Sequence, residues 1–175
     1  MKKGIVIALA ILMMFSFVGC GEKENIEQQL IGTSWHQTLT TETDIGAGRI
    51  TDDKDGHNYN CDVITLTITS TATYSFEENT FNTTTEVKQI KSGITKILDV
   101  EWDGGISITN EKDKEVTETS TETESVNGTW HFENDRLYMI ENGATTGVSY
   151  SVSIVNNELI LENEYAGIFL RLKKK

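Results

Sequence analysis

Histidines and carboxylates are the side chains of this sequence that could bind a metal or move a proton. His36 and His131 each follow a tryptophan, and His57 lies in a polar segment. Neighbouring residues of a strand point to opposite faces, so an inward tryptophan places its histidine outward. We therefore expect exposed histidines, with a His36 and His131 metal pair across neighbouring strands as the alternative. Because no serine elbow, phosphate loop, paired-cysteine motif or His-Glu-x-x-His occurs, the sequence predicts no enzyme and no cofactor.

A second candidate is the segment Thr51–Asp62, which partly matches a calcium-binding loop. Asp53, Asp55 and Gly56 occupy loop positions three, five and six. Position one is Thr51, however, and position twelve is Asp62 where a bidentate glutamate is needed, and no helical pattern flanks the loop. We therefore interpret the segment as a solvated turn that holds no metal.

A row of acidic residues forms the third candidate. Asp99, Glu101 and Asp103 alternate with apolar residues that include Leu98 and Trp102, which is the pattern of a strand with one acidic and one apolar face. Three neighbouring carboxylates could bind a cation or raise one another's pKa. An exposed acidic face needs no function, and this is the preferred interpretation.

The first 19 residues have the three parts of an export signal. Lys2 and Lys3 are positive, residues 5–17 are uncharged and apolar, and Val18-Gly19 is a small-residue approach to a cleavage site. The run from Gly4 to Gly19 has 16 residues, whereas a transmembrane helix needs roughly 20. We therefore interpret residues 1–19 as a cleaved signal peptide.

The cysteine that follows gives this signal a further meaning. Phe17-Val18-Gly19-Cys20 resembles the lipobox of bacterial lipoproteins, with Phe17 where leucine is usual. The resemblance implies cleavage just before Cys20, a diacylglycerol on its sulfur and acylation of its new amino group with a fatty acid such as palmitate. Two or three acyl chains hold a protein stably on a membrane. A plain signal peptide with an incidental cysteine is the alternative.

Residues 20–25 would then be a lipidated tether. Gly21, rather than an aspartate, follows Cys20. In this the sequence resembles lipoproteins that enteric bacteria sort to the outer membrane, and the resemblance implies that location. Glu22-Lys23-Glu24 resembles the acidic surface-export signal of lipoproteins from gut Gram-negative anaerobes. The expected location is the cell envelope, anchored by lipid in the outer membrane, with exposure on the cell surface as a further possibility.

Removal of the signal leaves 156 residues, with a single domain expected over 26–175. The signal holds two lysines and no acidic residue, so 13 basic and 27 acidic residues remain, a formal net charge of −14. This charge disfavours nucleic acid and anionic lipid surfaces as partners. With Cys20 lipidated, Cys61 has no disulfide partner and is most simply a small apolar filler, with a reactive thiol as the alternative.

The remaining sequence has the two-residue period of β-strands. It contains no proline and 24 threonines, and β-branched side chains suit a pleated, half-buried surface. Apolar residues alternate over 64–69, 72–76, 98–102, 106–108 and 148–154. One short helix is expected over Glu24–Ile31, ended by Gly32. Turn signals occur at Asp55-Gly56, Glu77-Glu78-Asn79, Ser92-Gly93, Asp103-Gly104-Gly105, Asn127-Gly128, Glu133-Asn134-Asp135, Asn142-Gly143 and Asn156-Asn157.

Strands with one apolar face must cover it, either by closing into a barrel or by folding into a sandwich. Consecutive hairpins favour an all-β, antiparallel up-and-down β-barrel of roughly eight to ten strands, with the short N-terminal helix plugging one end. Glu111–Ser125 alternates threonine with glutamate and serine, so it is polar on both faces. It predicts a protruding hairpin paired with Phe81–Val87, or a mobile loop.

Two segments resemble lipocalins. Leu30–Trp35 resembles the Gly-x-Trp start of the first lipocalin strand, with one extra residue. Asn127–Tyr138 and the alternating segments after it resemble the lipocalin-like domains of lipoproteins from gut Gram-negative anaerobes, over roughly residues 26–174. The resemblance implies a lipocalin-like barrel, with these aromatic residues as candidates for its interior or for facing a ligand: Trp35, Trp102, Trp130 and Tyr150.

Three functions follow from this fold. The preferred one is a non-catalytic interaction or scaffold module that contacts an envelope protein or a polysaccharide through its outer strands. The alternative is a carrier that binds a small apolar ligand in the barrel. An enzyme is disfavoured because no nucleophile and base are paired. A large empty cavity would favour the carrier, whereas a filled core with a flat exposed strand would favour the interaction module.

Overall fold

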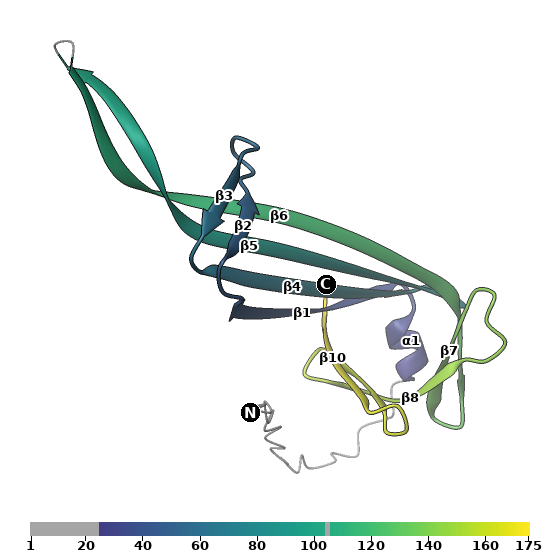
Figure 1. The fold of residues 1–175 in the computed structure, drawn as a ribbon. Helices are drawn as coiled ribbons and strands as arrows, with labels where there is room; N and C mark the ends of the chain where they lie inside the picture. The colour runs from purple at the N-terminus through teal and green to yellow at the C-terminus, as the bar shows by residue number, and fades with distance from the viewer. Residues whose placement is uncertain (1–24, 104–105) are drawn as a thin grey trace.

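The computed structural model describes residues 25–103 and 106–175, with the backbone alone over 100–103 and 106–108. Cys20 and the expected signal peptide lie outside the described residues. The described part is all-β with one short helix, as expected (Figure 1). Its elements are α1 (Ile26–Leu30), β1 (Thr33–Asp44), β2 (Gly48–Thr51), β3 (Asn58–Cys61), β4 (Ile64–Phe76), β5 (Thr80–Asp103), β6 (Ile106–Glu133), β7 (Arg136–Glu141), β8 (Val148–Val155), β9 (Glu158–Asn163) and β10 (Ile168–Lys174).

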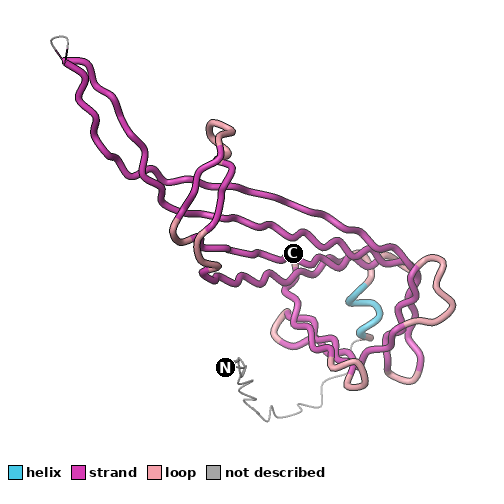
Figure 2. Tube along the Cα trace, in the orientation of Figure 1, coloured by secondary structure: helices cyan, strands magenta, loops and turns pink. Residues whose placement is uncertain are grey.

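Eight strands form a closed antiparallel ring in the order β1-β10-β9-β8-β7-β6-β5-β4. The hairpin of β2 and β3 is inserted between β1 and β4, and the other strands follow one another around the ring, as hairpin connections predict. Closure between β1 and β10 is short, with Trp35 opposite Lys174 and His36 opposite Lys173. The ring is therefore confined to one end of the molecule (Figure 2).

The strands differ greatly in length. β1, β4, β5 and β6 have 12, 13, 24 and 28 residues, whereas β7, β8, β9 and β10 have 6, 8, 6 and 7. The four long strands leave the ring as an extended sheet, and β5 and β6 continue further as a two-stranded arm (Figure 1). The expected barrel therefore closes only at one end, and the long strands continue beyond it as an open sheet.

The predicted protruding hairpin is present, but its register differs from the expectation. Thr84–Val87 is opposite Glu122–Ser125, whereas Glu111–Thr121 pairs with Lys88–Leu98. Leu98 is 69% exposed. The apolar face expected there to be buried is therefore wrong at this residue, because no described element covers this part of the arm.

The ring is filled from within by α1 (Figure 1). Asn25 caps this helix, since its side chain accepts a hydrogen bond from the Glu27 backbone N–H at 3.1 Å. Leu30 is fully buried in the core cluster of the ring. Gly32 ends the helical segment with a φ of 70°, and its N–H donates to the carbonyl of Phe76 in β4 at 2.8 Å. The helix is the plug that its position before the first strand predicts.

Several turn predictions are confirmed by backbone geometry. Asn134-Asp135 and Asn156-Asn157 all have positive φ, between 51° and 64°, as two-residue hairpin turns require. Ser92-Gly93 and Asn127-Gly128 are not turns but lie inside β5 and β6.

The glycines of these two wrong predictions allow close packing. A Cβ on Gly93 would lie 2.9 Å from the Cys61 sulfur, and one on Gly128 would lie 2.1 Å from the carbonyl oxygen of Ile140. Gly93 thereby lets the β2–β3 hairpin approach the sheet. A glycine inside a strand pattern marks such a close approach as readily as a turn.

Candidate functional site

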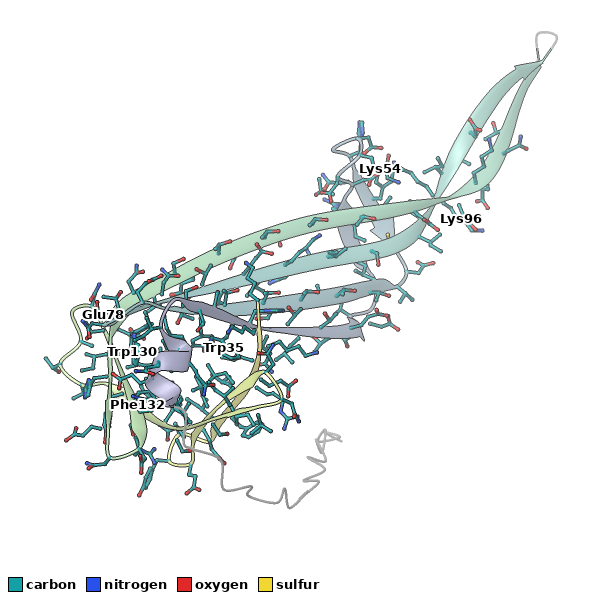
Figure 3. The ribbon with its side chains drawn as sticks, turned by 180° about the vertical axis from the view of Figure 1, so that it is seen from behind. Trp35, Lys54, Glu78, Lys96, Trp130 and Phe132 are labelled. Carbon is teal, nitrogen blue, oxygen red and sulfur yellow. The ribbon has the colours of Figure 1, made fainter. Side chains whose placement is uncertain are left out.

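The interior of the ring is occupied by the protein's own side chains. Trp35 is 1% and Trp130 3% exposed, and both lie in one cluster with Leu30. The rings of Phe76 and Trp130 meet edge to face, with centroids 5.7 Å apart. Figure 3 shows Trp35, Trp130 and Phe132 gathered around the helix. The described residues of this end form a packed core.

The indole N–H groups in this core have protein partners. Trp130 donates to the carbonyl oxygens of Glu77 and Thr80 at 2.8 and 3.1 Å, and Trp35 donates to the Thr33 hydroxyl at 2.8 Å. A buried tryptophan with a satisfied N–H is an ordinary core residue. Neither indole N–H is therefore held free for a ligand.

The other two candidate aromatics are placed differently. Tyr150 is partly buried and packs against the core cluster, where burial, and then the charge of Glu141, raises the pKa of its hydroxyl. Trp102 is the second-last residue of β5 and is opposite Ser107 of β6, at the end of the arm away from the ring, and its side chain is outside the described residues. The backbone position of Trp102 is enough to correct the expectation that it belongs to the ring interior.

The histidines do not form a metal pair. His36 is on β1 and His131 on β6, which are not neighbours in the ring. His131 is exposed and stacks on Tyr138 with centroids 5.2 Å apart. Among the residues that the structure describes, no group of three potential ligands is placed to hold a metal ion.

The segment once expected to be a solvated turn is anchored to the sheet through Lys114 of β6. Asp52 is fully buried, with its Oδ2 3.0 Å from the Lys114 ammonium. Asp55 forms a second ion pair with the same ammonium. The Tyr59 hydroxyl accepts from Lys114 and donates to Asp55, each at 2.8 Å. The solvated-turn interpretation therefore holds for the exposed turn over residues 53–56. It is wrong at Asp52, which is buried, and Asp55 pairs with Lys114 from within the turn.

The charges of this cluster stabilise one another. Lys114 lowers the pKa of both Asp52 and Asp55 below the ordinary carboxyl range. Asp55, then Tyr59 and Asp52 in turn, raise the pKa of Lys114. The ammonium also lies 3.9 Å from the centre of the Tyr59 ring, a distance typical of a cation–π contact. The opposite charges of the cluster neutralise one another, which is typical of a structural contact. We call this cluster of Asp52, Asp55, Tyr59 and Lys114 the clamp.

A second set of contacts fixes the opposite side of the hairpin. The Thr51 backbone N–H donates to the Glu118 carboxylate at 2.9 Å, and Lys91 donates to the same carboxylate at 2.7 Å. Thr95 donates to the carbonyl of Asn60 at 2.8 Å. Between the polar contacts lies a small apolar cluster of Ile50, Cys61, Ile64 and Val116. Cys61 is 3% exposed and fills space here, as expected.

An open groove of about 1110 Å³ borders the hairpin and the sheet. Its lining mixes polar side chains such as Asp62 and Glu115 with Val63 and Ile94, which are 54% and 59% exposed. Figure 3 places Lys54 on the hairpin and Lys96 near the start of the arm. The groove is an open surface of mixed polarity.

Between the ring and the hairpin, no element of the described residues covers either face of the sheet, which we call the bare sheet. One face continues the ring interior and carries Leu39, Leu66, Ile68 and Val87, of which Leu39 is 59% exposed. The opposite face carries columns of threonine, at 65, 67, 69, 71 and 73 in β4 and at 117, 119, 121 and 123 in β6. Cross-strand hydroxyl contacts join Thr38 to Thr71 at 3.1 Å and Thr40 to Thr69 at 3.3 Å. A sheet that is polar on one face and weakly apolar on the other can extend into water.

The bare sheet also has two free edges. β1 runs beyond His36 and β6 runs between Thr117 and Gly128 with no further strand beside them in the described part of the chain. Unpaired strand edges are templates for pairing with another chain. The alternating threonines predict the arm, whereas no sequence pattern indicates its free edges. The docking role of Lys114 has only one sequence signal, a lysine that alternates with acidic residues.

Comparisons with protein-family models, with curated proteins and with solved structures found no match to this chain. Within the described residues, no helix is both long and apolar enough to cross a membrane.

Proposed function

We propose that this protein is an envelope-anchored lipoprotein that acts as a non-catalytic interaction module, with the bare four-stranded sheet as its contact surface. The observation that carries the proposal is the contrast between the two ends of the same sheet. At the ring the inner face is covered by α1 and by β7–β10, whereas between the ring and the hairpin no element of residues 25–103 and 106–175 covers the same face.

The filled ring supports an interaction module over a carrier. Its core side chains Leu30, Trp35, Phe76 and Leu137 are at most 1% exposed, and small rings of eight strands are commonly filled in this way. A carrier would need this interior for its ligand. The proposal also includes a lipocalin-like barrel. The eight-stranded antiparallel ring and the helix before β1 support this fold.

The anchor is the second part of the proposal. Cys20 follows a signal-like segment and would hold the domain on the outer membrane by its acyl chains. Only five residues separate Cys20 from the first residue of α1, so the ring would sit close to the membrane. The long sheet would then be the part able to reach other envelope proteins or polysaccharides.

The proposal is tested by photo-crosslinking of the full chain in its envelope. A photoreactive residue replaces Leu39 or Lys88, which are exposed on the two faces of the bare sheet. The control is Tyr165, which is 100% exposed in the turn between β9 and β10. We expect discrete crosslinked products from the sheet positions and none from Tyr165. Equal products from all three positions, or none from the sheet, would reject the bare sheet as a contact surface.

A further inference from the structure

The free edge of β6 carries threonines in the same rows as those that β4 presents to β1. β4 and β6 both run antiparallel to β5, so they point in the same direction. Thr69 is in register with Lys88, which is in register with Thr121, and Thr71 is connected through Glu86 to Thr123 in the same way. Within the chain, Thr69 and Thr71 of β4 receive Thr40 and Thr38 of β1. β6 therefore presents a threonine column in the same rows and direction as that of β4, and no strand of the described residues lies beside it.

The backbone groups on both edges are positioned for pairing. In β6 the odd-numbered residues face outward, because the carbonyl groups of Thr117 and Asn127 accept from Asp53 and Asn142. In β1 the even-numbered residues face outward, because the carbonyl of Ser34 accepts from Lys175. Continuous registers carry this alternation to Thr119, Thr121 and Thr123 in β6 and to Thr38, Thr40 and Glu42 in β1. The two free edges thus have matching sets of unpaired donors and acceptors.

We propose that the β6 edge of one copy of this chain pairs with the β1 edge of a second copy, with Thr121 opposite Thr40. This inference rests on the proposed function of the bare sheet as a contact surface. β1 is antiparallel to β4, and β4 is parallel to β6, so a second copy in the same orientation continues the antiparallel alternation. Because the two edges differ, the contact is heterologous and repeats into a linear assembly.

Charge selects this pairing over pairing of two β6 edges. With Thr121 opposite Thr40, Glu122 is opposite Leu39 and Ser120 is opposite Thr41, so no like charges meet. Pairing β6 with itself places glutamates opposite one another in each central register, for example Glu122 against Glu122 or Glu124 against Glu118. Like charges directly opposite destabilise a strand pair. The net charge of −14 on each mature copy also repels, so the assembly should strengthen as salt screens it.

The test is disulfide crosslinking between Thr40→Cys and Thr121→Cys in the full chain, oxidised in the membranes of the expressing cells. Within one copy these positions are three strand spacings apart, about 14 Å, whereas a disulfide needs Cα atoms within about 7 Å. A bond between them must therefore join two copies. Thr40→Cys with Thr69→Cys, which face each other within one copy, is the positive control for oxidation, and the parent chain gives the background from Cys20 and Cys61.

We expect a ladder of dimers, trimers and longer species from the Thr40/Thr121 pair and background from each single variant. Dimers from Thr40→Cys alone, with nothing longer from the pair, would show that two β1 edges meet and would overturn the proposal. Background from all variants would overturn it as well. Crosslinks from Lys88 to a different molecule would in that case leave the proposed function standing, so the two failures are distinguishable. In sedimentation, Thr121→Pro should remain monomeric at salt concentrations where the parent chain assembles.

Discussion

Because the ring is filled, Leu30→Ala should lower the free energy of unfolding by an amount that can be worked out. Leu30 is fully buried in the core around α1. Removing three side-chain carbons loses about 2.5 kcal/mol of transfer free energy, at about 0.8 kcal/mol for each carbon. The cavity left in a core that collapses only partly raises the expected loss of unfolding free energy to about 3–4 kcal/mol. For a domain of this size, that loss corresponds to a fall in Tm of about 10 °C.

Ile31→Ala is the matched control, because Ile31 is the next residue and is 39% exposed. Scaling the same transfer free energy by its partial burial gives a loss of about 1–1.5 kcal/mol. Both variants are measured by urea denaturation, where the midpoint should fall while the m-value stays constant. The reasoning fails if Leu30→Ala costs no more than Ile31→Ala, since α1 would then not be packed into the ring. That result would leave the interior open and would favour the carrier.

Three further predictions concern the anchor, the clamp and the edge. Cys20→Ser should abolish the acyl mass that intact-protein mass spectrometry finds on the parent chain; the same acyl mass on the variant, or none on the parent chain, would reject lipidation. The stability difference between the parent chain and Lys114→Met should be largest between about pH 5 and pH 9 in urea melts. Because the carboxylate pKa values are depressed, this stability difference should shrink as the pH falls below their ordinary value of about 3.9. Because the lysine pKa is raised, the difference should also shrink as the pH rises above about 10.4. A stability difference that does not change with pH would contradict the ion pairs. Thr121→Pro should leave stability nearly unchanged, because the backbone N–H of Thr121 points outward. Glu122→Pro removes a ladder hydrogen bond to β5 and should lower the urea concentration at which the domain unfolds. Equal urea midpoints for the two variants would contradict the assigned edge.

Local sequence patterns predict the β class and two of the hairpin turns. The two-residue alternation gave the β class, and Asn134-Asp135 and Asn156-Asn157 gave two hairpin turns because only a few residue types tolerate positive φ. Such patterns fail at Gly93 and Gly128, where the reason for glycine is a distant chain segment, Cys61 or Ile140, that presses on the strand. Local sequence cannot distinguish a glycine that turns the chain from one that makes room for it.

The clamp was missed for a related reason. Asp52 and Asp55 lie in the segment that partly matches a calcium-binding loop, but their partner Lys114 is about 60 residues away in β6. A carboxylate that is buried against an ammonium has the same local sequence as one in a solvated turn. Only the register of β5 and β6, which brings Lys114 beneath the hairpin, separates the two interpretations.

The composition of the long strands explains where ring closure stops. Near the ring, the inner positions of β4, β5 and β6 are Phe76, Phe81 and Val126, which need cover from α1 and the short strands. Further out, the inner positions of β6 become Glu122 and Ser120 and the outer ones remain threonine, so covering them would bury unpaired polar groups at a cost. The sheet therefore stays open beside the polar inner positions of β6, although Leu39, Ile68 and Val87 keep the inner face of the other strands weakly apolar. Its backbone edges still lack partners among the described residues. An open sheet with one polar face, one weakly apolar face and two unpaired edges supports the proposal that it gains strands rather than encloses a ligand.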